Sequence, residues 1–197
     1  MNMRPYFVEV LGTPEAGKTT TIKEVISSLT SKGYNVKYIQ ESAEIVPTEF
    51  PKASIEAHIW MRLHTAQEIL LSSFSTFDII IVDRGILDTM FWDYLFFKRD
   101  KLTEKQLSSV DNFFKNLGFM PDFVIILSTS PEEAILRRGG EGRIVTKKFI
   151  ESFNTDLKSF SEKQITIPKL EIDTTNMSVE TVSKQVEKAI LQNRKSN

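Results

Sequence analysis

Short apolar runs alternate along the chain with longer segments in which apolar residues recur every three or four positions. Short runs that end at a glycine or a polar residue predict buried strands. Such runs cover residues 6–11, 35–40, 78–83, 123–127 and 170–173. Because strands that alternate with helices form a parallel sheet with right-handed crossovers, the pattern predicts an α/β fold.

Helical periodicity is clearest in three segments: one that begins at Lys18 and stops near Gly33, one from about Ser54 to Leu71, and one at the C-terminus. A helix with one apolar stripe is amphipathic, and we expect each segment to form such a helix. The stripes are Ile22, Val25, Ile26 and Leu29, then Ile55, Ile59, Leu63, Ala66 and Leu70, then Val179, Val182, Val186 and Ile190.

The composition is that of a globular protein, because 41% of the 197 residues are hydrophobic and the formal net charge is −1. We expect one domain over residues 1–197. The balanced charge argues against a nucleic-acid partner, and the absence of cysteine excludes disulfides and a thiol nucleophile. Since no apolar run approaches the ~20 residues that cross a bilayer, and no signal peptide is recognisable at the N-terminus, we expect a cytoplasmic protein without a membrane partner.

A complete G-x-x-x-x-G-K-[ST] motif lies between the first predicted strand and the first predicted helix. In this P-loop motif the glycines let backbone N–H groups turn toward phosphate oxygens, and the helix N-terminus adds its dipole. Lys18 would reach the β- and γ-phosphates and Thr19 would bind Mg²⁺, which predicts ATP and Mg²⁺ as ligands. The expected nucleotide-binding residues are Gly12, Thr13, Pro14, Glu15, Ala16, Gly17, Lys18, Thr19 and Thr20.

Charged residues follow two other predicted strands, and the carboxyl ends of parallel strands are where ligands bind. Asp83 is a candidate second residue at the metal, although a helix cap would also explain it. Arg84 is a candidate for holding substrate or the charge on the transferred group, with an ordinary ion pair as the alternative. Glu41 is a candidate base for a hydroxyl acceptor. Glu44 competes for that role, and a solvated glutamate remains the plain interpretation.

Two further features are candidates for substrate contacts. Trp60, His64 and Gln67 form a second stripe on the 54–71 helix that would suit a nucleobase, with ordinary packing as the alternative. An arginine- and glycine-rich stretch at about 137–146, which contains Arg137 and Arg143, predicts a lid that closes over ATP and brings positive charge to the transition state. A solvated turn is the alternative there.

Together, the P-loop, Glu41, Asp83-Arg84 and the arginine loop resemble the thymidylate kinase and deoxynucleoside kinase group of P-loop kinases. The resemblance implies a three-layer P-loop NTPase fold, with a five-stranded parallel sheet and helices on both faces. It also implies ATP·Mg²⁺ as donor, a nucleoside or nucleoside monophosphate as acceptor, and a homodimer. The Asp83-Arg84-Gly85 segment instead resembles P-loop domains of the ribosylnicotinamide kinase type.

These observations predict a small-molecule kinase that transfers the γ-phosphoryl group of ATP to a nucleoside or nucleotide-like acceptor. The alternative is a P-loop ATPase or nucleotide switch that acts on a protein partner. The lid and the candidate acceptor carboxylate favour the kinase.

Overall fold

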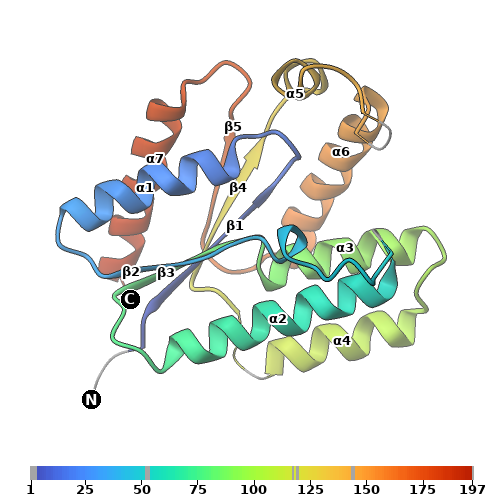
Figure 1. Ribbon diagram of the computed structural model, residues 1–197, viewed down its shortest axis with the longest axis horizontal. Helices are drawn as coiled ribbons and strands as arrows, with labels where there is room; N and C mark the ends of the chain where they lie inside the picture. Colours follow the sequence, from blue (N-terminus) through green and yellow to red (C-terminus); the bar gives the residue numbers. More distant parts are fainter. Residues whose placement is uncertain (1–3, 52–53, 117, 119, 143–144, 197) are drawn as a thin grey trace.

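The computed structural model describes residues 4–51, 54–116, 118, 120–142 and 145–196, and alternates strands with helices as the pattern predicts (Figure 1). In the described part, the strands are β1 (Tyr6–Gly12), β2 (Val36–Ile39), β3 (Ile79–Asp83), β4 (Phe123–Ser128) and β5 (Lys169–Asp173). The helices are α1 (Lys18–Ser31), the 3₁₀ turn η1 (Ser42–Glu44), α2 (Ile55–Ser73), α3 (Ile86–Lys98), α4 (Glu104–Asn116), α5 (Pro131–Arg138), α6 (Lys147–Gln164) and α7 (Val179–Ser196).

The strands form one five-stranded sheet with the order β2-β3-β1-β4-β5, and every pairing is parallel. This confirms the predicted fold. β1 lies at the centre, where its Val10 pairs with Asp83 of β3 on one side and with Ile125 of β4 on the other. The loops that follow β1 and β3 therefore meet at the same edge of the sheet, which is where ligands bind in open α/β folds.

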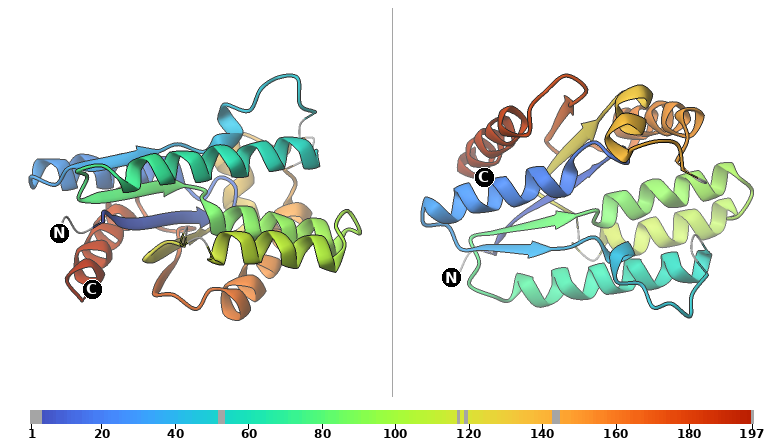
Figure 2. Two further views of the ribbon diagram at one scale, coloured as in Figure 1. Left: turned by 90° about the horizontal axis from the view of Figure 1, so that it is seen from below. Right: turned by 45° about the horizontal axis from the view of Figure 1, so that its top comes forward.

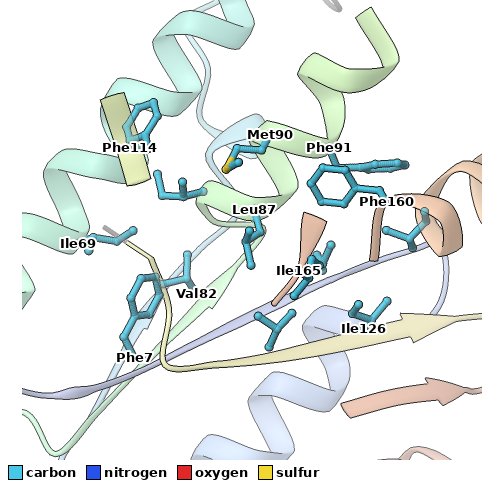
Figure 3. Packing of buried hydrophobic residues seen from close by; sticks show 14 of the residues in the cluster. Phe7, Ile69, Val82, Leu87, Met90, Phe91, Phe114, Ile126, Phe160 and Ile165 are labelled. Atoms are coloured by element: carbon cyan, nitrogen blue, oxygen red, sulfur yellow. The ribbon is translucent and has the colours of Figure 1, made fainter. Parts of the chain in front are cut away.

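Helices cover both faces of the sheet. On one face, α1 and α7 pack against alternate residues of β1, β3 and β4, including Val8, Ile81 and Ile125. On the other face, α2, α3, α4 and α6 pack against the intervening residues; Figure 3 shows part of this cluster, including Phe7, Val82, Met90, Phe91 and Phe160. Central strands covered on both faces read as continuous apolar runs, which explains why they could be found from sequence.

The prediction that the apolar stripe of the second helix is buried is wrong for most of its residues. Ile59, Leu63 and Leu70 are 48%, 58% and 48% exposed, whereas Ala66 is buried. The buried face of α2 lies next to this stripe and carries polar residues beside apolar ones: His58, Arg62 and Thr65 are among its buried members. These polar side chains face other charged and polar groups instead of the sheet, so polarity does not mark the exposed side of this helix.

Helices α3 and α4 pack together beyond the carboxyl end of β3, and α2 packs beside α3 there before its C-terminal half runs back along the sheet (Figures 1 and 2). Within the part of the chain that the structure describes, no helix is both long enough and apolar enough to cross a membrane.

Candidate active site

The P-loop begins at Gly12, where the backbone of β1 comes very close to β4. A Cβ atom at this position would lie 1.9 Å from the carbonyl oxygen of Leu127, and Gly12 has a φ of 147°, so glycine is required. The next amide, of Thr13, donates to the Leu127 carbonyl at 2.9 Å. The Thr13 hydroxyl donates to Asn154 Oδ1 on α6 at 2.5 Å. Glu15 has a φ of +62°, an unfavourable conformation that the loop fixes.

Lys18 lies inside the curl of the P-loop, where its ammonium donates to the carbonyl oxygens of Thr13 at 2.8 Å and Gly12 at 3.2 Å. The side chain is buried. Burial, together with the nearby Arg84 guanidinium, lowers the pKa of Lys18 to about 7. A cation held in this way is unfavourable by itself and gains from a negatively charged group beside it.

Thr19 and Asp83 meet at the carboxyl ends of β1 and β3, as the sequence suggested. The Thr19 hydroxyl donates to Asp83 Oδ2 at 2.6 Å, and the Tyr38 hydroxyl lies 3.4 Å from the same oxygen. Asp83 is fully buried. Thr20, in the first turn of α1, is exposed, so it is less enclosed than its neighbour.

Glu41 and Arg84 form an ion pair in which Glu41 Oε2 lies 3.1 Å from Arg84 Nε. Asp88 Oδ2 lies 3.9 Å from Nη1 of the same guanidinium. Burial raises the pKa of Glu41, and Asp88 adds to this effect while Arg84 opposes it. Burial also lowers the pKa of Arg84, but Asp88, Glu41 and Asp83 outweigh it and raise the pKa overall. Two carboxylates therefore share one guanidinium.

Two buried carboxylate oxygens at this edge have no hydrogen-bond partner among the described residues: Asp83 Oδ1 and Asp88 Oδ1. Buried polar atoms in native proteins nearly always have a partner. Their grouping beside the P-loop indicates a site built to contact a ligand.

A pocket of about 210 Å³ opens next to the Glu41–Arg84 pair, between α2 and α3. Polar and apolar side chains line its walls, as in small-molecule sites. Those from the two helices are His58, Met61, Thr65, Asp88, Thr89, Trp92 and Phe96. The sequence analysis missed most of these residues, and the one available signal was the cluster of aromatic residues within 90–97.

The pocket lining in the described part of the chain does not include Trp60, His64 or Gln67. Trp60 and His64 stack on each other, with ring centroids 5.0 Å apart, and Gln67 is exposed. The structure therefore does not bring this stripe to the pocket. The neighbouring face of α2 supplies the lining instead, because one residue along a helix is a rotation of about 100°.

His58 lines the pocket and contacts the buried Arg62–Asp93 ion pair of α2 and α3, which lies behind it. Its Nε2 lies 3.1 Å from Asp93 Oδ1 and 3.2 Å from the Thr89 carbonyl oxygen. Burial, together with the Arg62 guanidinium, lowers the pKa of His58 to about 4. The imidazole is therefore neutral at pH 7.

We expect His58 to make the protein less stable in acid. Its pKa is about 4 in the folded state against an ordinary 6.5, so between these values the unfolded chain binds more protons and stability falls as the pH is lowered. From pH 7.5 to 5.0 this contribution is roughly 2 kcal/mol. Urea unfolding at both pH values should show a smaller loss in His58→Gln than in wild type. His64→Gln is the matched control, and an equal change in all three proteins would contradict the expectation.

The arginine loop starts beside the P-loop. Arg137 donates to the Glu15 carbonyl at 3.2 Å and to the Thr174 carbonyl at 2.7 Å, and it pairs with Glu133 at 2.8 Å. Arg138 lies 3.3 Å from Glu15 Oε1. The other expected lid arginine, Arg143, lies outside the described residues. Arg137 and Arg138, at the end of α5, therefore join the start of this loop to Glu15 of the P-loop.

No known family model matches the chain. Curated proteins with similar sequences are kinases that act on a nucleotide. A thymidylate kinase of Caldanaerobacter subterraneus subsp. tengcongensis is 27% identical over an alignment of 209 positions, which covers 95% of this chain and 96% of that protein. A thymidylate kinase of Thermoanaerobacter sp. is also 27% identical, over 150 positions that cover 70% of this chain and 72% of the other. The chain is a homologue of the thymidylate kinases.

Solved structures show the same fold. A deoxyadenosine kinase from M. mycoides, solved with the products dCMP and dCDP, superposes with a TM-score of 0.72 at 20% identity. The match covers 94% of this chain and 99% of that one. A second structure of that kinase, with dATP bound, gives a TM-score of 0.71. The resemblance inferred from the motifs is thus confirmed by homology to one kinase and by the fold of another.

Proposed function

We propose that this chain transfers the γ-phosphoryl group of ATP to a hydroxyl group of a nucleoside. Its homology and fold are those of an ATP-dependent nucleoside or nucleotide kinase. The two classes of kinase differ in the acceptor, which is a neutral hydroxyl for a nucleoside and a phosphate for a nucleoside monophosphate. The charges beside the P-loop distinguish these acceptors.

The Glu41–Arg84–Asp88 cluster carries the proposal. Its two carboxylates and one guanidinium give the pocket mouth a net negative charge when all are ionised. His58 adds no positive charge because its pKa is about 4. Arg62 is already paired with Asp93. An acceptor phosphate would meet like charge here, whereas a hydroxyl group can use a carboxylate as its proton acceptor.

The relatives support both acceptors to different degrees. The deoxyadenosine kinase structure contains dCMP as a product, which fits phosphorylation of a nucleoside. The curated relatives are thymidylate kinases. Since the charge argument concerns side chains of this chain, it favours the first acceptor.

In the proposed reaction, Lys18 and the P-loop amides hold the phosphates of ATP. The acceptor oxygen forms a bond to the γ-phosphorus of ATP. The bond between the γ-phosphorus and the oxygen it shares with the β-phosphate breaks, and ADP leaves. Glu41 accepts the hydroxyl proton. Arg84 stabilises the charge on the transferred group, and we assign the same role to Arg137 and, from the sequence, to Arg143.

We propose Mg²⁺ as the metal, held by Thr19 and Asp83 together with the phosphates. The donor atoms fit, because both residues offer hard oxygen ligands and Asp83 Oδ1 has no other partner among the described residues. The described residues contain no group of three or more His, Cys, Asp or Glu placed to hold a metal ion. Mg²⁺ needs no such group, since it usually binds one or two carboxylates plus phosphates and water. When bound, it neutralises charge between the β- and γ-phosphates.

An acceptor panel tests the proposed function. Purified protein is incubated with γ-labelled ATP, Mg²⁺ and, in separate reactions, nucleosides, ribosylnicotinamide and nucleoside monophosphates, and all products are separated. We expect label on a nucleoside and not on a monophosphate. Label only on a monophosphate would overturn the acceptor assignment. Release of inorganic phosphate alone would favour the ATPase or nucleotide switch.

We also propose that the exposed face of α2 pairs with a second copy of the chain. Five of the ten large exposed apolar residues of the described part lie on α2 or at its C-cap. Ile59, Leu63 and Leu70 lie in one narrow stripe, as expected for a helix that buries this face in an interface. The resemblance to dimeric kinases implies a homodimer, so we take the partner of this surface to be the same surface of a second copy.

Sedimentation measurements test the pairing. The wild-type protein should sediment as a dimer, and Leu63→Asp should shift it to the monomer by placing a charge in the interface. Leu136→Asp is the matched control, because Leu136 is 73% exposed on α5, away from α2. A wild-type monomer at all concentrations would contradict the proposal.

A further inference from the structure

A glutamate lies at the centre of the sheet, in the middle of the apolar run of β1. Glu9 has no exposed surface. Its neighbours on the same face of β1 are Phe7 and Leu11, which belong to the apolar cluster under α3. A carboxylate is costly to bury unless its oxygens are hydrogen-bonded. Its contacts therefore explain why it is there.

The Glu9 carboxylate accepts hydrogen bonds from three backbone amides at the start of α3. They are the amides of Gly85 at 3.1 Å, Leu87 at 3.1 Å and Asp88 at 2.8 Å. The N-cap residue of α3 is Gly85, which has no side chain to cap the helix. Glu9 takes over this task from a strand 76 residues earlier in the chain.

Glycine at position 85 is matched to this glutamate. A Cβ atom there would lie 2.6 Å from Glu9 Oε2 and 2.7 Å from its Cδ. Any larger residue would push the carboxylate away from the amides. The two positions therefore form one unit, in which the glutamate supplies the cap and the glycine supplies the space.

The first turns of α3 carry much of the proposed acceptor site. Arg84 precedes the helix and Asp88, Thr89 and Trp92 lie on it, and all four line the pocket. Arg84 has a φ of +59°, an uncommon conformation, and its amide donates to the Val10 carbonyl at 2.9 Å. Two kinds of hydrogen bond thus hold this segment on β1: one to the backbone carbonyl of Val10 and others to the side chain of Glu9.

We propose that Glu9 is a positioning residue for the acceptor, which sets the place of Arg84 and Asp88 through the N-terminus of α3. The inference rests on the proposed function, because it assigns these two residues to acceptor binding and transfer. Glu9 itself touches neither ATP nor acceptor in this scheme. Its loss is therefore expected to affect the acceptor without affecting ATP.

Kinetics of Glu9→Gln give the first test. The glutamine amide keeps the size of the side chain but turns one oxygen into a donor that faces backbone N–H groups. A misplacement of about 1 Å costs on the order of 10²-fold in rate, so kcat/KM for the acceptor should fall by about that factor while the KM for ATP stays within about twofold. Assays at pH 8.5 compare ionised carboxylate with amide, because burial raises the pKa of Glu9 to about 8.

A double-mutant cycle gives the second test. Gly85→Ala in the wild-type background should impair acceptor turnover, because its Cβ displaces the carboxylate. Glu9→Asp withdraws the carboxylate by one methylene, so Gly85→Ala should cost less in that background. The matched control for a buried carboxylate is Glu187→Gln on α7, where Glu187 pairs with Lys32 on the other face of the sheet. It should change stability without changing the KM of the acceptor.

Each outcome decides the inference. If wild type is active and Glu9→Gln loses stability but keeps its acceptor kcat and KM, the positioning role is overturned and Glu9 is a structural residue only. If wild type phosphorylates no acceptor, the proposed function fails, and hydrogen exchange decides the role instead. Unchanged protection of the amides of Gly85, Leu87 and Asp88 in Glu9→Gln would then overturn the role. Loss of protection there, with the P-loop amides unchanged, would support it.

Discussion

Substitution of Lys18 by alanine should reduce phosphoryl transfer by at least about 10³-fold. The reason is that Lys18 is the buried cation of the P-loop, with its ammonium 2.8 Å from the Thr13 carbonyl oxygen. Transfer places charge on the β- and γ-phosphates, and water cannot replace a fixed ammonium inside the loop. The measurement is the rate of labelled product formation at saturating ATP.

The same substitution should leave the protein folded and no less stable. The pKa of Lys18 is lowered to about 7, which means that the folded state disfavours its charge. Removing the charge therefore relieves a cost, as often happens at functional sites. Lys23→Ala, at an exposed position on α1, is the matched control and should retain full activity. Turnover of Lys18→Ala close to that of Lys23→Ala would refute the role of the P-loop in catalysis.

Glu41→Gln should lower kcat by about 10²- to 10⁴-fold, the usual contribution of a general base. Glutamine keeps the shape beside Arg84 but cannot accept the hydroxyl proton. The KM for ATP should change little, because Glu41 lines the acceptor pocket and the P-loop holds the nucleotide. Steady-state kinetics with the acceptor found in the panel provide the measurement.

The pH profile separates a base from a merely structural residue. Glu41 must be ionised to act, so wild-type kcat should fall as the pH is lowered through its pKa, which burial raises above the ordinary glutamate value. This acid limb should be absent in Glu41→Gln. Glu44→Gln is the control, since Glu44 is exposed three residues later. If Glu44→Gln were impaired and Glu41→Gln were not, the base would be Glu44.

The pocket between α2 and α3 shows where sequence patterns fail. On α2 the apolar stripe Ile59, Leu63 and Leu70 is exposed, and His58 and Arg62 are buried. The apolar side of an amphipathic helix is normally the buried side. This rule fails where buried residues of the helix contact polar groups. Here part of the buried face is polar and contacts the pocket or other charged groups, so the apolar stripe does not mark the buried side.

Glu9 was missed for a related reason. Its position in an apolar run was visible in the sequence, but its partners are backbone amides of residues 85–88, which no side-chain pattern reveals. Long-range contacts of this kind depend on which strand lies next to which. The order of the strands places β3 directly beside β1, and so brings the start of α3 over Glu9.

The sequence by itself determined the fold of this protein and predicted its nucleotide site, because both depend on local order along the chain. Buried parallel strands are continuous apolar runs, and the P-loop is eight consecutive residues whose chemistry follows from their types. The proposed acceptor site was visible in the sequence only as Glu41 and Arg84, and the rest of it depended on tertiary structure. Glu41, His58 and the segment with Arg84 and Asp88 are far apart in the chain, and only packing brings them to one pocket, balances their charges and shifts their pKa values.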